Sequence, residues 1–345
     1  MISINTKSKK EIQNIPLITI AITCYNAEKT IERALESAFY QDWPNFEIII
    51  IDDGSTDNSV KLIKKWSLNH KKLVILFNEN NQGCAFSRNK IIDKAKGEFI
   101  AFFDDDDFSL SDRIRLQYEK LIEYEGLKGT QLVACFASGK RIYTNGYIKH
   151  FNSVGSKGNP PIGIQMANYL LFFERCKGIH YGGGVPTCSL FLRTSVFKNF
   201  GVFDPSMKRQ EDVDFAIRIA MNGAHFIGVK KSLVKQYVTI SNDKAAIIEY
   251  QSSSLLIEKY HSYLESKNLY KYMLMWTKLR YYHFISKKFK AIIILIKLFI
   301  YYPFRSSKHF FYSATRRFLH EQLIYSREDH LNLRLKCVKL LSKFL

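Results

Sequence analysis

An apolar run that ends in four consecutive carboxylates constrains the fold of this chain more than any other stretch. Residues 100–103 (Ile-Ala-Phe-Phe) are bulky enough to form a buried strand, and the aspartates 104–107 follow directly. In an open α/β sheet, ligands bind just beyond the carboxyl ends of such strands. Because alternate side chains of an extended segment point the same way, Asp104 and Asp106 can chelate a divalent cation, which usually also binds a substrate phosphate. The alternatives are a solvated acidic loop and the start of a helix.

The composition indicates a globular, strongly basic protein. Hydrophobic residues make up 46% and charged residues 24% of the 345 residues, which is typical of a chain with a folded core. The formal charge is +19, so we expect anionic partners such as nucleotides, nucleic acid or an anionic membrane. Residues 241–345 alone carry 19 Lys and Arg against 7 Asp and Glu. We therefore predict a lead (1–15), a main α/β domain (16–240) and a basic C-terminal region (241–345).

The cysteines and the N-terminus predict a cytoplasmic protein. None of the six cysteines is spaced as C-x-x-C, which favours reduced thiols. Residues 1–14 are polar and lack the apolar core of a signal peptide. No uncharged apolar run is as long as a membrane span.

The order of the apolar segments predicts a mostly parallel sheet with helices on both faces, as in Rossmann-like folds. Strands and helices alternate through the first hundred residues, a pattern typical of β-α-β units. The strands are expected at 16–24, 46–51, 73–77 and 98–103, and the helices near 31–38, 55–66 and 83–95, the second of them capped by Ser55 or Thr56. The carboxyl edge of this sheet would gather Tyr25, Asp53 and the aspartates 104–107. A hairpin or mobile loop is expected at 141–159.

A strand, a turn that carries carboxylates and a helix, in that order, resemble one mononucleotide-binding half of a Rossmann-like fold. The glycine fingerprints of dinucleotide-binding folds and of P-loops are absent from the sequence, so neither class is supported. Asp53 at such a turn can accept a hydrogen bond from a nucleotide base or a ribose hydroxyl. Turn formation and helix capping are equally compatible with Asp53 and Asp57.

Five strings in this part of the chain, in this order and spacing, resemble glycosyltransferase family 2. They are Ile-Thr-Cys-Tyr-Asn-Ala (22–27), Gln41, Ile-Asp-Asp-Gly-Ser-Thr-Asp (51–57), Asn-Gln-Gly-Cys-Ala-Phe-Ser-Arg-Asn (81–89) and Phe-Asp-Asp-Asp-Asp (103–107). The resemblance implies the GT-A fold, a nucleotide-sugar donor such as a UDP-sugar, a requirement for Mn²⁺ or Mg²⁺, and inversion at the anomeric carbon.

The resemblance also implies roles for single residues. Asp53 matches the residue that holds the nucleotide base, and Asp104 and Asp106 match the D-x-D pair, with Asp106 as metal ligand and Asp104 as a second ligand near the ribose. The donor-binding residues would be Tyr25, Asp53, Arg88, Asp104 and Asp105. The chain departs from the family at Asp105, where a small residue is frequent, and at Ser87, where Ala is usual.

Glu211 and Asp212 precede the apolar positions of a later helix, so we expect them at its N-terminus, where the helix dipole favours ionised carboxylates. Simple capping is the alternative. The pair matches the catalytic Glu-Asp motif of the family, which implies that Asp212 takes the proton of the acceptor hydroxyl and that Glu211 orients the acceptor.

The C-terminal region is expected to be helical at 245–263 and 267–290. The apolar segment 291–304 that follows is too short to span a bilayer but is suited to its interface. Basic and aromatic residues around it fit an anionic leaflet, and the basic ones are Lys287, Lys288, Lys290, Arg305, Lys308, Arg316 and Arg317. The alternative is a helix packed on the main domain or on a partner in a homodimer.

Together these observations predict an inverting, metal-dependent glycosyltransferase, peripheral at the inner face of the cell membrane, with a saccharide or lipid-linked acceptor. A Q-x-x-R-W string after Glu211 and Asp212 and membrane spans are both absent, which argues against a processive synthase. Two alternatives stay open: a sugar-phosphate nucleotidyltransferase, and an inactive membrane-associated saccharide-binding or scaffold protein. Nucleic acid is disfavoured because no recognition motif for it is found. Donor and acceptor specificity is expected in the segment 141–184.

Overall fold

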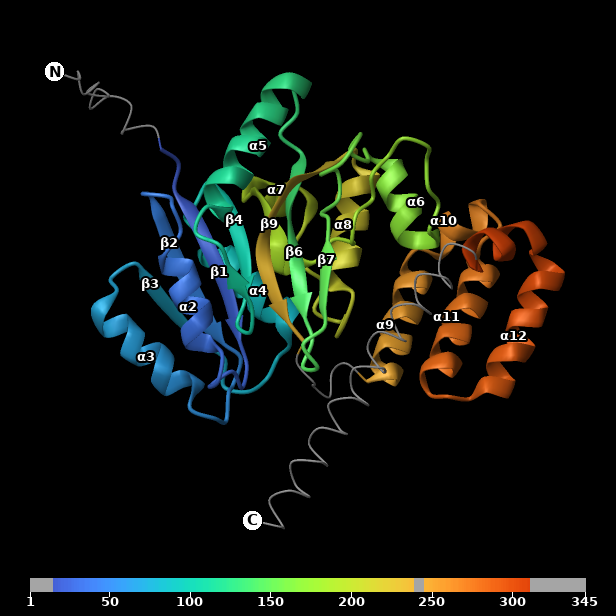
Figure 1. Ribbon diagram of the computed structural model, residues 1–345, viewed down its shortest axis with the longest axis horizontal. Coiled ribbons are helices and arrows are strands. Elements are labelled where there is room, and N and C mark those ends of the chain that lie inside the picture. Colours follow the sequence, from blue (N-terminus) through green and yellow to red (C-terminus); the bar gives the residue numbers. More distant parts are fainter. Residues whose placement is uncertain (1–14, 239–244, 311–345) are drawn as a thin grey trace, which may run out of the picture. The chain divides into compact units, whose positions relative to one another are not determined.

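The computed structural model describes residues 15–238 and 245–310 (Figure 1). The chain divides into two compact units. The first holds the residues up to Gly139 together with Phe151–Leu170 and Arg175–Lys235, and the second holds Lys140–His150, Leu171–Glu174 and the residues from Gln236 onward. Among the described helices, none is both long and apolar enough to cross a membrane.

The first four strands form the parallel part of the sheet in the order β3-β2-β1-β4. They are β1 (Ile18–Cys24), β2 (Phe46–Asp52), β3 (Leu73–Phe77) and β4 (Phe99–Asp104), and they alternate with α2 (Ile31–Phe39), α3 (Ser59–Asn69) and α4 (Cys84–Lys94). The predicted β-α-β-α-β-α-β order is confirmed. Strands β1, β2 and β4 are buried on both faces, as is usual for parallel strands, whereas the edge strand β3 leaves Val74 and Phe77 exposed.

The rest of the sheet continues in the order β4-β8-β6-β9-β5, and β7 pairs with β6. These strands are β5 (Phe108–Ser109), β6 (Val133–Ile142), β7 (Ile148–Phe151), β8 (Leu190–Arg193) and β9 (His225–Tyr237). Strand β8 runs antiparallel to both β4 and β6, and β5 runs antiparallel to β9. The parallel character predicted for the sheet is therefore limited to its first half. The predicted hairpin after residue 141 is the β6–β7 connection.

The main core lies between the sheet and the helices of one face. Alternate residues of β1 point into it, namely Ile18, Ile20 and Ile22, together with apolar residues of α2, α3 and α5 (Arg113–Lys128). The remaining helices of this part of the chain are α6 (Ile164–Phe172), α7 (Ser195–Phe200) and α8 (Glu211–Met221), with a 3₁₀ turn at Thr187–Ser189.

The described part of the second unit is largely helical and includes α9 (Ala246–Lys259), α10 (His261–Ser266), α11 (Tyr270–Phe284) and α12 (Lys288–Tyr301). The predicted helix 245–263 is interrupted at Tyr260, and the predicted helix 267–290 was too long. Asn268 and Ser286 adopt left-handed backbone angles that an α-helix does not contain, and they separate α11 from α10 and from α12. Arg316 and Arg317 lie outside the described residues.

Candidate active site

The site is built at the edge where three parallel strands end side by side. Cys24, the last residue of β1, pairs with Asp52 of β2, and Thr23 pairs with Asp104 of β4. The turns that follow are bonded to each other: the Tyr25 N–H donates to Oδ2 of Asp105 over 2.9 Å, and the Asp53 N–H donates to the Cys24 carbonyl over 2.8 Å. Tyr25, Asp53 and the aspartates that follow β4 are therefore gathered at one edge, as the strand order requires.

Asp53 is buried and its carboxylate orders the loop that precedes α4. It accepts hydrogen bonds from Nδ2 of Asn78 (2.6 Å) and from the N–H groups of Gln82 (2.9 Å) and Gly83 (2.8 Å). Gly54 next to it has a φ of +73°, and a Cβ there would lie 2.6 Å from the backbone of Asn80. Only glycine therefore fits this turn. The contact of Asp53 with a nucleotide base stays a prediction.

The turn after Asp53 differs from its prediction, because neither Ser55 nor Thr56 caps the helix. Helix α3 begins at Ser59, whose N–H donates to Oδ1 of Asp57 over 2.9 Å. Ser55 instead accepts from the Asn26 N–H (2.9 Å), and the Thr56 N–H donates to Oδ1 of Asn26 (2.8 Å). These residues tie the turn after β2 to the turn after β1.

Asp104 and Asp105 lie in an environment that disfavours their ionised form. Burial, together with the charges of Asp106 and Asp104, raises the pKa of Asp105 to about 8, although the Tyr25 N–H opposes the shift. Burial also raises the pKa of Asp104, with Asp106 and Glu211 adding to the effect and Arg88 opposing it. The ionised forms of Asp104, Asp105 and Asp106 therefore repel one another. Oxygen donors in such a cluster fit a hard divalent cation such as Mn²⁺ or Mg²⁺.

A second grouping of possible ligands shares Asp104 with this cluster and adds Cys188, which was not predicted. One ligand atom each of Asp104, Asp107 and Cys188 lies within 4.8 Å of the others. Arg113, which is fully buried, already supplies positive charge there: burial lowers its pKa to about 10, and the charges of Cys188, Asp104 and Asp107 oppose that shift. We therefore assign this grouping to the support of β4, whose Phe102 carbonyl accepts from Nη2 of Arg113 over 2.9 Å.

Arg88 connects the strand-end carboxylates to helix α8. Its Nη1 lies 2.6 Å from Oε1 of Glu211, and its Nη2 lies 3.4 Å from Oδ1 of Asp104. The guanidinium is buried and lies 5.6 Å from the centre of the Phe203 ring. Burial disfavours the cation, but the flanking thiol and carboxylates more than offset it and raise the pKa of Arg88. Donor binding by Arg88 stays a prediction; what the structure adds is its position between two carboxylates.

Helix α8 begins at Glu211, as predicted, after Gln210 in the left-handed region with a φ of +66°. Asp212 therefore lies in its first turn, where its Oδ1 accepts from the Val213 N–H over 2.8 Å. Burial, and next the charge of Glu211, raise the pKa of Asp212 to about 7, while Arg88 opposes the shift. A carboxylate with such a pKa can accept a proton near neutral pH.

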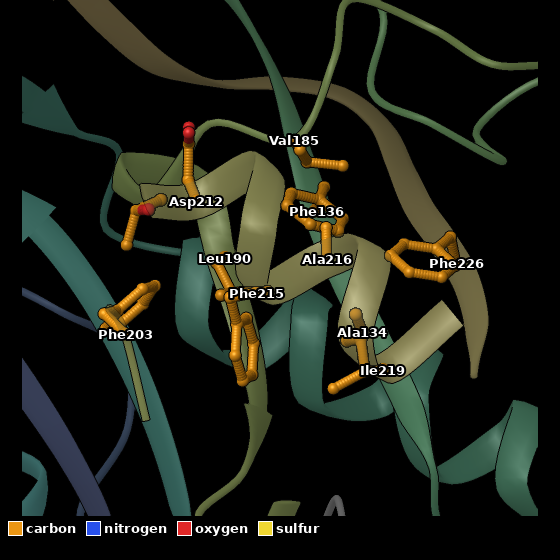
Figure 2. A pocket seen from close by; sticks show the side chains of 11 residues that line it. Ala134, Phe136, Val185, Leu190, Phe203, Asp212, Phe215, Ala216, Ile219 and Phe226 are labelled. Atoms are coloured by element: carbon orange, nitrogen blue, oxygen red, sulfur yellow. The ribbon is translucent and has the colours of Figure 1, made fainter. Parts of the chain in front are cut away.

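Asp212 borders a small apolar cavity formed by β6, β8, β9 and α8 (Figure 2). Figure 2 shows its carboxylate directed away from the phenylalanine rings that line the rest of the cavity. The cavity volume of about 10 Å³ corresponds to a single water molecule, so no sugar fits inside. The apolar lining instead covers one side of Asp212 and contributes to the burial that raises its pKa.

Two residues of the site were missed from the sequence. Asn78 follows β3 directly and donates to Asp53, and its Oδ1 accepts from Nζ of Lys90 over 2.8 Å. The strand-end argument that found Asp53 would also have found Asn78. Thr187, which lines the same cavity as Asp212, has a buried hydroxyl oxygen without a hydrogen-bond partner among the described residues. No sequence signal marks it.

Replacing Arg88 should destabilise the protein strongly. Arg88→Ala leaves Glu211 and Asp104 facing each other without the intervening cation, and breaking a buried ion pair in this way typically costs about 3–5 kcal/mol. The free energy of unfolding in urea measures the loss. Arg115→Ala is the matched control, because Arg115 pairs with Asp42 at the surface and its loss should leave the unfolding midpoint unchanged. Equal effects of the two substitutions would contradict the assigned role.

Comparison with known proteins identifies the family. The family model described as glycosyl transferase family 2 matches residues 19–198, which is more than half of the chain. The chain belongs to glycosyltransferase family 2. The matched segment of this family 2 chain runs from β1 through β4 into α7 and so includes every strand end described above.

Individual relatives agree with this membership. An uncharacterized glycosyltransferase of Haemophilus influenzae is 38% identical over 110 residues, and the match covers 32% of this chain and 44% of the relative. The chain thus spans less than half of that relative's length. The β-1,3-glucosyltransferase WfaP of Escherichia coli, named for UDP-Glc and α-D-GlcNAc-diphosphoundecaprenol, is 31% identical over 202 residues, covering 58% and 68% of the two chains.

The fold agrees with that of a solved structure. The crystal structure of residues 1–349 of TarS from S. aureus in complex with UDP-GlcNAc matches with a TM-score of 0.57 at 19% identity, covering 81% of this chain and 79% of that one. The GT-A type of fold predicted for this family 2 chain is thereby confirmed.

Proposed function

We propose that this protein transfers one sugar from a nucleotide-diphosphate sugar to a hydroxyl of a saccharide or lipid-linked acceptor, with inversion at the anomeric carbon. The observation that carries the proposal is the Arg88 bridge between Asp104 and Glu211. It connects the carboxylates suited to a cation with the first turn of α8, where the raised pKa of Asp212 supports its role as the base. An inverting transfer needs both elements in one site and no covalent nucleophile.

In the proposed mechanism, each of these residues has a separate role. Asp212 takes the proton of the acceptor hydroxyl as its oxygen attacks the anomeric carbon. Glu211, held by Arg88, orients the acceptor. Asp106, aided by Asp104, would hold Mn²⁺ or Mg²⁺, and the bound cation would stabilise the negative charge that develops on the departing nucleoside diphosphate. Tyr25, Asp53 and Asp105 would hold the nucleoside.

The similar proteins support a choice of substrates. WfaP is named for a UDP-glucose donor and a diphosphoundecaprenol-linked acceptor, and the TarS structure contains UDP-GlcNAc. We therefore infer a UDP-sugar as donor and a lipid-linked saccharide as acceptor, in the synthesis of a cell-surface polysaccharide or glycolipid. Such an acceptor places the reaction at the cytoplasmic face of the cell membrane.

A donor screen tests the proposal. The protein is incubated with UDP-, GDP- and dTDP-sugars, with Mn²⁺, with Mg²⁺ or with EDTA, and release of the nucleoside diphosphate is measured. We expect slow hydrolysis of one donor that depends on the cation. The same donor should raise the melting temperature only when the cation is present, because a ligand that binds the native state alone stabilises it. A lack of both hydrolysis and stabilisation with every donor would favour the scaffold alternative.

The pKa of Asp212 predicts the pH dependence of the transfer. Because the base must be ionised, kcat/KM should rise as the pH increases through about 7 and level off above it. Glu211→Gln removes one of the two causes of the raised pKa, so the acid limb should move to lower pH. Asp93→Asn, a similar loss of charge at an exposed position of α4, should leave it in place. An acid limb that stays fixed in Glu211→Gln would argue against Asp212 as the base.

A further inference from the structure

Helix α12 carries an exposed apolar face in addition to the face that packs on α11. The exposed residues follow helical spacing at positions i, i+3, i+4, i+7 and i+11, and they are Phe289, Ile292, Ile293, Ile296 and Ile300. Their side chains are 39–77% exposed, and Phe304 just beyond the helix is 92% exposed. Leu298, on the opposite side, is fully buried. A helix of a soluble protein does not normally leave a second apolar stripe in water.

The borders of this exposed face are cationic. Lys290 and Lys297, seven residues apart, follow one border of the helix, and Lys288 lies on the other. All three are exposed. Residues 266–310 contain ten Lys and Arg and no Asp or Glu. Lysines at both borders can extend past an apolar face while their charged ends reach anionic headgroups, which is the arrangement of interfacial helices.

We propose that the outer face of α12, defined by Phe289, Ile292, Ile293, Ile296, Ile300 and Phe304, docks on an anionic lipid surface. The charge pattern selects lipid over a second copy of the chain. Two copies joined through this face would bring their lysines together with no acidic residue of residues 266–310 to balance them. Anionic phospholipids supply the missing negative charge.

The inference rests on the proposed function, since a lipid-linked acceptor lies in the same bilayer. Docking itself can be measured without donor or acceptor. The full chain is sedimented with phosphatidylcholine vesicles that contain or lack phosphatidylglycerol. We expect the protein to bind the anionic vesicles. Ile296→Gln/Ile300→Gln should lower the affinity for these vesicles by at least about tenfold, because the burial of even one isoleucine side chain contributes that much to binding. Leu68→Gln/Leu127→Gln, at exposed positions of α3 and α5, is the matched control and should bind normally.

The contribution of the lysines to vesicle binding is tested with its own control variant. Lys288→Gln/Lys290→Gln/Lys297→Gln should weaken binding to anionic vesicles by about 100-fold. Lys61→Gln/Lys65→Gln/Lys71→Gln removes the same charge from exposed positions of the first unit and should weaken it by less than about tenfold. Equal losses in the two variants would overturn the assignment of the contact to α12.

Hydroxyl-radical footprinting of the unmodified protein distinguishes lipid from other occupants. Phe289 and Phe304 should be oxidised readily in solution and protected when anionic vesicles are added. Protection without vesicles would mean that a second copy or another part of the chain covers the face, and it would overturn the proposal. Membrane docking and the proposed catalytic function are tested independently. Asp106→Asn should bind vesicles normally, and Ile296→Gln/Ile300→Gln should still hydrolyse a soluble donor.

Discussion

Asp212→Asn should lower kcat by about 10²–10⁴-fold while leaving the binding of cation and nucleotide intact. The substitution keeps the shape of the side chain and removes its ability to take a proton, and general-base catalysis typically contributes a factor of this size. Asp212 lies in the first turn of α8 and is not one of the carboxylates that follow β4. Steady-state kinetics with the identified donor, together with calorimetric binding of UDP, separate the two effects.

The thermal stability of Asp212→Asn provides a second check, because we expect it to stay the same or increase while the activity falls. Burial and Glu211 raise the pKa of Asp212 to about 7, so above pH 7 its ionised form opposes folding. Asn carries no charge and so removes this destabilising effect. Asp212→Asn should therefore melt at the same temperature as the wild type at pH 8, or at a higher one. Asp214→Asn is the control within the same helix: it weakens the contact of Asp214 Oδ2 with Nε of Arg218 (3.0 Å) and should lower stability. An inactive Asp212→Asn that is also unstable would point to a structural role.

Asp106→Asn should abolish cation-dependent hydrolysis of the donor, with a loss of about 10³-fold or more, since a bound cation contributes several kcal/mol of charge stabilisation. The protein should stay folded, because the substitution removes one charge from a crowded group of carboxylates. Asp106 is partly exposed and its backbone carbonyl accepts from Nη2 of Arg33, a contact that Asn retains. Asp93→Asn at the surface of α4 should keep full activity. Retained activity in Asp106→Asn would mean that the cation lies elsewhere.

The sequence predicted the parallel half of the fold well and the antiparallel half only in part. Strands such as β1 and β4 are buried on both faces, so their apolar runs stand out, and the helices between them carry regular apolar spacing. The two-residue β5 carries no such signal, because its pairing with β9 depends on contacts between residues far apart in the chain. The break at Ser286 was missed because serine does not end a helix by itself, and the break at Asn268 was predicted slightly too early, between residues 263 and 267.

The same distinction applies to the site. Tyr25, Asp53 and Asp104 were found because parallel strand ends share one edge, a rule that needs only the order of the strands. The bond between Arg88 and Glu211 joins residues 123 positions apart, and no local pattern predicts it. The balance of charge around Asp107 depends likewise on Arg113, which enters from α5.

Binding of UDP in the presence and absence of Mn²⁺, compared between Asp106→Asn and Asp212→Asn, tests most directly whether the carboxylates that follow β4 and the first turn of α8 serve one reaction. We expect tight binding in the wild type only with Mn²⁺, loss of that binding in Asp106→Asn, and its full retention in Asp212→Asn, which is nevertheless inactive. Nucleotide binding that ignores Mn²⁺, or that survives in Asp106→Asn, would contradict the account.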